Sequence, residues 1–145
     1  MTIAFIGAGN MAISLIRGLV KNGMQSSELV AADPSDEQRA KAQELGIRAE
    51  ANNARAVSDA DIIVVAVKPQ IAGQVLKALT TVTSSQLVIS VAAGINLDSL
   101  QAWLPRDQPI VRCMPNTPAL VGAGMTALFA NNKVQAKHLA AAERV

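Results

Sequence analysis

Short apolar runs alternate with helical patterns of apolar and polar residues along almost the whole chain. The apolar runs predict strands at residues 2–6, 29–32, 47–49, 62–67, 87–91, 110–113 and 124–130. The segments between them predict helices at residues 10–22, 35–45, 54–58, 71–79 and 96–104, and a further helix from 134 onward. Because strand and helix alternate, the sequence predicts an α/β fold with a doubly wound parallel sheet and right-handed crossovers.

Capping and turn residues mark the ends of these elements. Gly23 stands where a helix C-cap belongs, and Ser35 and Asn96 stand where helices start. The run at 62–67 is continuously apolar and mostly β-branched, which is typical of a strand covered on both faces. Two prolines predict a loop at 115–118, because proline is excluded from helix interiors and central strands.

The first predicted strand runs directly into a glycine turn, Gly7-Ala-Gly9-Asn-Met-Ala12, which opens the first helix. This is the dinucleotide-binding fingerprint with Ala12 in place of the third glycine. Gly7 permits a sharp turn, Gly9 lets a pyrophosphate approach the backbone, and Ala12 is small enough for close packing of helix on strand. The alternative is a tight strand-to-helix turn that binds nothing. The strand–turn–helix context favours a nucleotide site of Rossmann type.

Asp33 closes the second predicted strand, 21 residues after Ala12. An acidic residue at this point holds the adenosine ribose hydroxyls in NAD-specific folds and repels a 2′-phosphate. Asp33-Pro34 also has the pattern of a helix N-cap followed by proline. Ser35 and Arg39 are near enough to receive a 2′-phosphate instead. The choice between NAD and NADP stays open.

Two further segments follow predicted parallel strands, Lys68-Pro69 and Ala92-Ala93-Gly94. Ligands of open α/β sheets bind beyond the carboxyl ends of the strands, so these segments are expected to join the glycine turn and Asp33 at one edge. Lys68 is interpreted either as a solvated lysine or as a residue whose backbone and stem contact the cofactor.

Other polar residues give weaker signals. Asn116 and Thr117 lie in the predicted proline-rich loop and either face a substrate or hydrogen-bond within their own turn. His138, the only histidine, is expected on an exposed helix face, and Cys113 is expected to be a small buried hydrophobe. No metal-ligand spacing or catalytic triad is evident.

Composition excludes several classes of protein. The chain has 145 residues, of which 50% are hydrophobic and 17% charged, with a formal net charge of +2. Scattered basic residues and only three aromatic residues argue against nucleic-acid binding. The apolar runs are too short to cross a bilayer, and the N-terminus lacks the pattern of a signal peptide. One cysteine excludes an internal disulfide, so a cytoplasmic setting is expected.

Four motifs together resemble the pyrroline-5-carboxylate reductase family: residues 5–11, 66–70, 90–95 and 112–118. The resemblance extends over essentially the whole chain, and the pair Ala-Val-Lys-Pro and Met-Pro-Asn-Thr-Pro is its most specific part. It implies reduction of the cyclic imine 1-pyrroline-5-carboxylate to L-proline with NADPH or NADH, the last step of proline biosynthesis. The implied cofactor is NADP(H), with NAD(H) possible because of Asp33.

The resemblance also implies a role for particular residues. Those expected to contact the cofactor are Ile6, Gly7, Ala8, Gly9, Asn10, Met11, Asp33, Ser35, Asn53, Ala66, Val67, Lys68, Pro69, Val91, Ala92 and Ala93. Those expected near the imine are Met114, Pro115 and Asn116. No residue is assigned as a catalytic acid or base, and no metal is expected.

The family has a second, helical domain that forms the dimer and much of the substrate pocket. The last predicted helix reaches Val145 without a cap, so residues 1–130 are expected to be the dinucleotide-binding domain and 131–145 the start of a helix leading to that second domain. Homo-oligomers through the second domain and low activity of these 145 residues alone are therefore expected. Two alternatives are a deazaflavin-linked NADP oxidoreductase and a non-catalytic nucleotide-sensing module.

Overall fold

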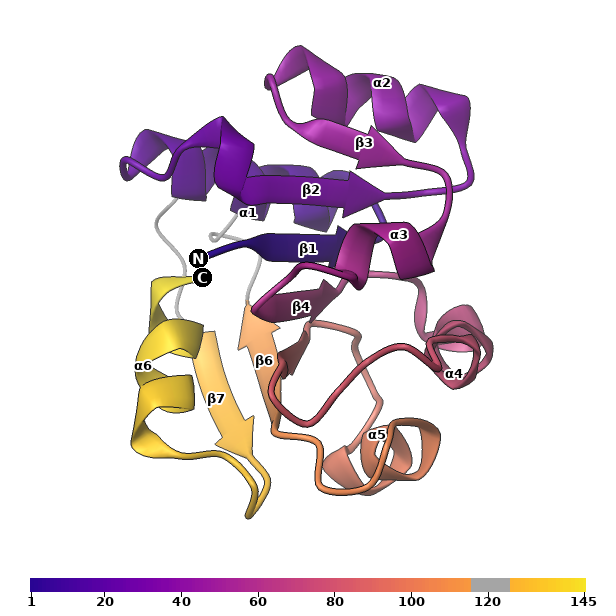
Figure 1. Ribbon diagram of the computed structural model, residues 1–145, viewed down its shortest axis with the longest axis vertical. Helices are drawn as coiled ribbons and strands as arrows, with labels where there is room; N and C mark the ends of the chain where they lie inside the picture. Colours follow the sequence, from indigo (N-terminus) through magenta and orange to yellow (C-terminus); the bar gives the residue numbers. More distant parts are fainter. Residues whose placement is uncertain (116–125) are drawn as a thin grey trace.

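The computed structural model describes residues 1–115 and 126–145, and it shows a three-layer α/β domain (Figure 1). The strands are β1 (Ile3–Ile6), β2 (Leu29–Ala32), β3 (Arg48–Glu50), β4 (Ile62–Val65), β5 (Leu87–Ser90), β6 (Ile110–Pro115) and β7 (Thr126–Ala130). The helices are α1 (Asn10–Lys21), α2 (Asp36–Glu44), α3 (Asn53–Val57), α4 (Pro69–Ala78), α5 (Leu97–Trp103) and α6 (Ala136–Arg144), with a 3-10 turn at Ser26–Glu28.

The seven strands form one sheet in the order β3-β2-β1-β4-β5-β6-β7. Strands β1 to β6 run parallel, and the chain order reverses direction between β1 and β4. This arrangement confirms the predicted doubly wound Rossmann-type sheet. One strand differs from the expectation, because β7 pairs antiparallel to β6.

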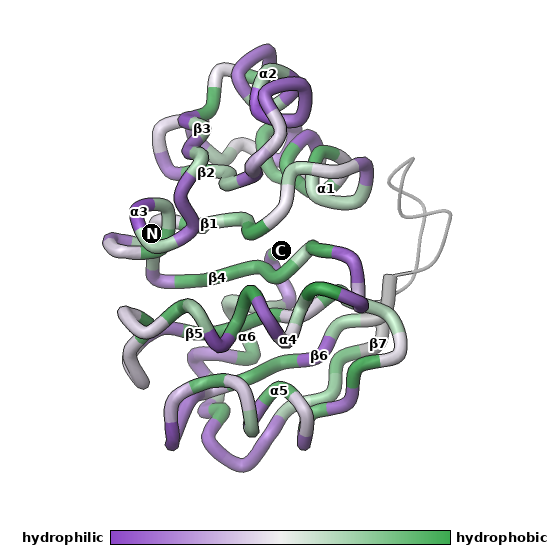
Figure 2. The backbone as a smooth tube through the Cα atoms, turned by 90° about the vertical axis from the view of Figure 1, so that its right-hand side faces the viewer, coloured by the Kyte–Doolittle hydropathy of each residue, from purple (hydrophilic) through white to green (hydrophobic). Residues whose placement is uncertain are grey.

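Helices cover both faces of the sheet, and as a result every residue of the four strands β2, β1, β4 and β5 is buried. Alternate residues of β1 point to opposite faces, so that Ala4 and Ile6 join one core and Ile3 and Phe5 join the other. The first core is closed by α3, α4 and α5, and the second by α1, α2 and α6. In Figure 2 the central strands are hydrophobic, while the outer turns of α2 are hydrophilic.

The prediction of a loop from Pro115 onward is wrong at its first residue, because β6 extends to Pro115. Strand β6 pairs with β5 as far as Arg112. From Cys113 to Pro115 it pairs with β7, and Pro115 lies opposite Thr126. A strand bordered on one side tolerates the missing N–H of proline. Residues 116–118 of the predicted loop lie outside the described residues.

Candidate dinucleotide site at the carboxyl edge of the sheet

Five parallel strands end in the same row of the sheet. Ile6 lies beside Ala32 and Val65, Ala32 lies beside Glu50, and Val65 lies beside Ser90. The connections that follow therefore start side by side at one edge. Hydrogen bonds join them, including Gly7 N–H to the Ala32 carbonyl at 2.7 Å and Ala66 N–H to the Ile6 carbonyl at 2.8 Å. The carboxyl edge expected from the sequence is thus a continuous surface of backbone.

The two glycines of the first turn have different physical reasons to be glycine. Gly7 has a φ of 95°, and a Cβ there would lie 2.8 Å from the Ala66 carbonyl oxygen. Gly9 has an ordinary φ of −75°, and a Cβ there would meet no protein atom within 4 Å. The fold therefore requires glycine at position 7 but leaves open space at position 9. That open space lies where a pyrophosphate would approach the backbone.

Helix starts at this edge fall into two groups. Helices α2, α3 and α5 have side-chain caps: Ser35, Asn52 and Asn96 each accept a hydrogen bond from a first-turn N–H. Helices α1 and α4 have Gly9 and Lys68 as N-caps, without a side-chain cap bond and without an acidic residue in the first turn. The two starts without caps follow β1 and β4, where the strand order reverses. Uncapped N–H groups with positive dipole ends suit an anion.

Asp33 connects the second strand to the glycine turn. One carboxylate oxygen accepts a hydrogen bond from Ala8 N–H at 2.9 Å, and the other accepts one from Ser35 N–H at 2.9 Å. The N-cap of α2 is Ser35, whose hydroxyl accepts from Gln38 N–H, so the interpretation of Asp33 as the helix cap is wrong. Its carboxylate lies at the glycine turn, as the ribose interpretation requires.

The segment after β4 contacts the glycine turn. The strand ends at Val65, so Ala66 and Val67 belong to the connection, and their atoms are the neighbours that a Cβ at Gly7 would meet. Lys68 is exposed, and Pro69 is the first residue of α4, where its missing N–H has no helical partner to lose. This segment and the glycine turn face each other across the reversal point.

After β5, Val91 N–H donates to the Val65 carbonyl at 3.1 Å, which brings Val91 to the same edge. Ala92 is buried, whereas Ala93 and Gly94 are exposed. Strand β6 continues three residues past Arg112, so the backbone of Met114 and Pro115 extends beyond the row where β4 and β5 end. Asn116 and Thr117 lie outside the described residues.

Asn53, the first residue of α3, lines a groove of about 560 Å³ between α3 and α4. Ile71 and Gln74 of α4 form the opposite side, and Ile71 is 45% exposed. The sequence pattern indicated neither residue, and Ile71 was missed because an apolar residue in an amphipathic helix predicts core. The exposure of Ile71 is the signal that only the structure provides.

The lone cysteine directly follows Arg112 on β6 and lines a pocket with Val91, whereas the lone histidine lies at the start of α6. Burial raises the pKa of the Cys113 thiol to about 11, which supports its interpretation as a small hydrophobe. His138 is only half-exposed, and its Nδ1 accepts a hydrogen bond from Gln135 N–H at 3.0 Å at the start of α6. The histidine thus has a capping role that the expectation of a solvated side chain missed.

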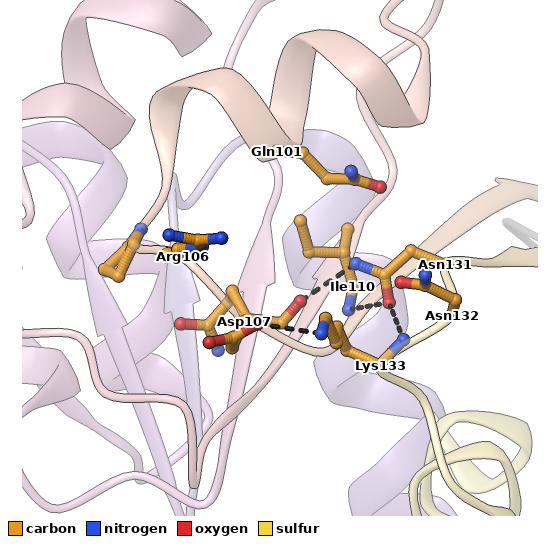
Figure 3. Close-up of a pocket in the computed structure, with 9 residues that line it drawn as sticks. Gln101, Arg106, Asp107, Ile110, Asn131, Asn132 and Lys133 are labelled. Carbon is orange, nitrogen blue, oxygen red and sulfur yellow. Dashed lines mark hydrogen bonds and ion pairs between the residues drawn. The ribbon is translucent and has the colours of Figure 1, made fainter.

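A second hollow, of about 320 Å³, lies at the opposite, amino edge of the sheet (Figure 3). It lies among the turn after α5, the start of β6 and the turn after β7. Lys133 Nζ reaches Asp107 at 2.8 Å, and the Asn131 side chain bonds to the backbone of Ile110. Lys133 lowers the pKa of the Asp107 carboxyl by hydrogen bonding and by its charge. The polar groups here bond mainly to one another.

Neither a metal site nor a membrane span is found in the part of the chain that the structure describes. Within residues 1–115 and 126–145, His, Cys, Asp and Glu side chains form no group of three that could hold a metal ion. In the same residues, no helix is both long enough and apolar enough to cross a membrane.

The fold and the carboxyl edge define a dinucleotide-binding domain of Rossmann type, and comparison with known proteins gives its family. Residues 2–94 match the family described as NADP oxidoreductase coenzyme F420-dependent. The chain belongs to this family.

Similarity extends further to pyrroline-5-carboxylate reductases. The enzyme of that name from Pseudomonas aeruginosa is 52% identical over 136 residues, which are 92% of this chain and 50% of the relative. The structure of a pyrroline-5-carboxylate reductase from Coxiella burnetii superimposes with a TM-score of 0.92 at 37% identity, over 98% of this chain and 54% of that one. The resemblance predicted from the four motifs is confirmed.

The structure of a third relative was determined with NADP bound. It is the pyrroline carboxylate reductase of Plasmodium falciparum, with a TM-score of 0.86 and 31% identity over 98% of this chain and 52% of that one. The chain therefore spans about half the length of the relatives it matches.

Proposed function

We propose that this chain is the dinucleotide-binding part of a pyrroline-5-carboxylate reductase, which reduces 1-pyrroline-5-carboxylate to L-proline with NADPH or NADH. The observation that carries the proposal is Gly9, which neither backbone conformation nor protein packing requires to be glycine. A ligand that approaches the backbone explains its identity. The similarity to named pyrroline-5-carboxylate reductases supports the choice of substrate.

In this proposal the protein binds and orients, and the dinucleotide, when bound, supplies the hydride. Uncapped N–H groups at the starts of α1 and α4 hold the pyrophosphate between the turn at 6–11 and the segment at 66–69. Asp33 and Ser35 face the adenosine ribose, and Asn53 lies on the adenosine side. Val91, Ala92 and Ala93 are assigned to the nicotinamide side of the site, and Met114, Pro115 and Asn116 are assigned to recognition of the imine.

The proposal also covers the parts beyond the cofactor. Residues 1–130 form the cofactor domain, and 131–145 begin a helix that leads towards a second domain, since the named relatives are about twice as long. That domain provides most of the imine pocket and the homo-oligomer contact. Nucleic acid and membrane are not partners, and the protein acts in the cytoplasm.

The experiment that tests this proposal measures dinucleotide binding and imine reduction separately. Titration of NADPH and NADH with the 145-residue chain, followed by nicotinamide fluorescence, is expected to give saturable binding. The rate of NADPH or NADH oxidation that depends on pyrroline-5-carboxylate is expected to be low with this chain and high with the full-length gene product. Binding without imine reduction by the full product would instead support a nucleotide-sensing module.

A deazaflavin-linked NADP oxidoreductase is a second candidate, because the family description names that coenzyme. The two enzymes are separated by their substrates. NADPH oxidation that depends on a deazaflavin, with none that depends on the imine, would establish this candidate in place of the reductase. The names of the relatives that are 41–52% identical favour the imine.

A further inference from the structure

Three hydrogen bonds made by the backbone N–H and the carboxylate of Asp33 hold the turn between β2 and α2 in one conformation. The Asp33 N–H donates to the Glu50 carbonyl at 3.0 Å, and the carboxylate oxygens accept from Ala8 N–H and Ser35 N–H. The carboxylate is therefore fixed at the glycine turn. Each of its oxygens retains a lone pair for a further donor.

Arg39 of α2 holds the same turn through its main chain. One guanidinium nitrogen, Nη1, donates to the carbonyl oxygens of Asp33 at 2.8 Å and Pro34 at 3.0 Å. The other, Nη2, pairs with the carboxylate of Asp36. The Arg39 side chain is only 20% exposed, whereas that of Asp36 is 94% exposed. The guanidinium thus binds the turn from which Asp33 projects.

Two further cations on this side also face a carboxylate. The Nε atoms of Arg48 and Arg55 lie 3.8 Å and 3.9 Å from the carboxylate of Glu50, which ends the neighbouring strand β3. A 2′-phosphate beside Asp33 would therefore meet a fixed negative charge, and the nearby arginines would have to leave their present partners. A free 2′-hydroxyl meets an acceptor without these penalties.

We propose that Arg39 is a positioning residue for ribose recognition: it fixes the turn that places the Asp33 carboxylate on Ala8 N–H, and this chain thereby binds NADH more tightly than NADPH. The inference rests on the proposed function and narrows its choice of cofactor. It also reverses one expectation from the sequence, in which Arg39 was a candidate to receive the 2′-phosphate. In this proposal Arg39 favours a ribose with a free 2′-hydroxyl, because its bonds to the Asp33 and Pro34 carbonyls hold the turn that carries the Asp33 carboxylate.

The test compares the dissociation constants of NADH and NADPH, measured by nicotinamide fluorescence, for the chain and a set of variants. The unaltered chain is expected to bind NADH about tenfold more tightly, as one hydrogen bond to a charged group allows. Arg39→Gln is expected to weaken the binding of NADH without weakening that of NADPH, so that the ratio of the two dissociation constants falls towards one. Arg39→Lys keeps the charge but not the planar guanidinium, whose Nη1 donates to both carbonyls while Nη2 pairs with Asp36, and it is expected to behave like Arg39→Gln.

Two further variants make the result specific. Asp33→Asn keeps the shape of the side chain, and it is expected to weaken NADH and to tighten NADPH by removing the repulsion. Lys41→Gln, two positions further along α2 and paired with Glu37, is the matched control and is expected to leave the ratio unchanged. Circular dichroism at increasing temperature confirms that each variant is folded.

Several results would overturn the inference. Tighter binding of NADPH by the unaltered chain would do so, as would an unchanged ratio in folded Arg39→Gln. A selective loss of NADPH affinity in Arg39→Gln would show that Arg39 binds the 2′-phosphate. Each of these leaves the proposed function standing, because a dinucleotide still binds. Absence of binding by both cofactors would overturn the proposed function, and this inference with it.

Discussion

The two edges of the sheet differ in how the backbone groups that end there are hydrogen-bonded. At the carboxyl edge, the helices that follow β1 and β4 begin without side-chain caps. At the amino edge, buried amide side chains bond to the backbone. Gln86 donates to the carbonyls of Val57 and Ala60 at 2.8 Å each and accepts from Thr83 N–H at 2.9 Å.

The amide bonds at the amino edge form a connected series. Gln108 donates to the Gln86 carbonyl, and Asn131 donates to the Gln108 carbonyl at 2.9 Å while accepting from Ile110 N–H. The backbone groups bonded in this series thus find their partners within the protein, although Gln108 Oε1 is itself buried without a hydrogen-bond partner. The carboxyl edge leaves the starts of α1 and α4 without side-chain caps, so we expect the amino edge to stabilise the fold and the carboxyl edge to bind a ligand.

The largest effect is expected at the glycine that the fold itself requires. Gly7→Ala would place a Cβ against the Ala66 carbonyl oxygen in a backbone conformation that L-residues avoid. The free energy of unfolding is expected to fall by about 3 kcal/mol, the sum of strain and overpacking. Chemical denaturation of the chain without cofactor measures it. A loss of less than about 1 kcal/mol would contradict the difference drawn between the two glycines.

The next effect is expected at Gly9, where only binding should suffer. Gly9→Asp would place a carboxylate in the open space at the start of α1, where it can cap the helix and repel a pyrophosphate. Dinucleotide affinity is expected to fall by about 100-fold, which corresponds to about 2.7 kcal/mol. Fluorescence titration measures the affinity, and denaturation is expected to show equal or higher stability.

Gly9→Asn is the matched control for this variant, because it has the same shape without the charge. It is expected to lose less affinity than Gly9→Asp, and the difference measures the repulsion. Unchanged binding in both variants would show that no phosphate approaches Gly9, and the proposed site would then be wrong.

A smaller effect is expected at the amino edge, on stability alone. Gln86→Leu removes three hydrogen bonds and leaves the Val57 and Ala60 carbonyls without this donor. The free energy of unfolding is expected to fall by about 2 kcal/mol, the cost of buried groups that lose their partner. Dinucleotide affinity is expected to stay the same. Gln101→Leu, on the exposed surface of α5, is the control for replacing an amide and is expected to be near neutral.

What the sequence predicted follows from how local each signal is. The order of strands and helices and the fingerprint at Gly7–Ala12 depend on neighbouring residues, so the pattern located them. The bond from Gln86 to Val57 joins residues 29 positions apart, and the one from Ala8 to Asp33 joins residues 25 apart. Such contacts depend on the completed sheet. The same reason explains why the direction of β7 was missed.

The site shows the same division. The sequence indicated Asp33 but left its role open, because ribose binding and helix capping use the same residue type at the same place. The structure excludes the capping role, because Ser35 is the N-cap of α2, while ribose binding by Asp33 stays a prediction. Arg39 was noticed as a nearby cation, but its bonds to two main-chain carbonyls have no sequence signature.

The smallest effect is expected at His138, where α6 begins. Burial lowers the pKa of His138 below its usual 6.5, and the neighbouring Lys137 lowers it further. The neutral ring is the form that accepts from Gln135 N–H. As the pH falls below about 6.5, the unfolded chain binds a proton that the folded chain resists, so stability decreases until the folded pKa is reached.

His138→Gln, which lacks this titration, is expected to show a flatter stability profile between pH 5 and 8. Denaturation midpoints across that range measure it, and the Asp107–Lys133 pair does not interfere, because lowering the pKa of Asp107 moves its titration below about 3.8. If both chains lost stability equally over the range, His138 would have no part in capping α6.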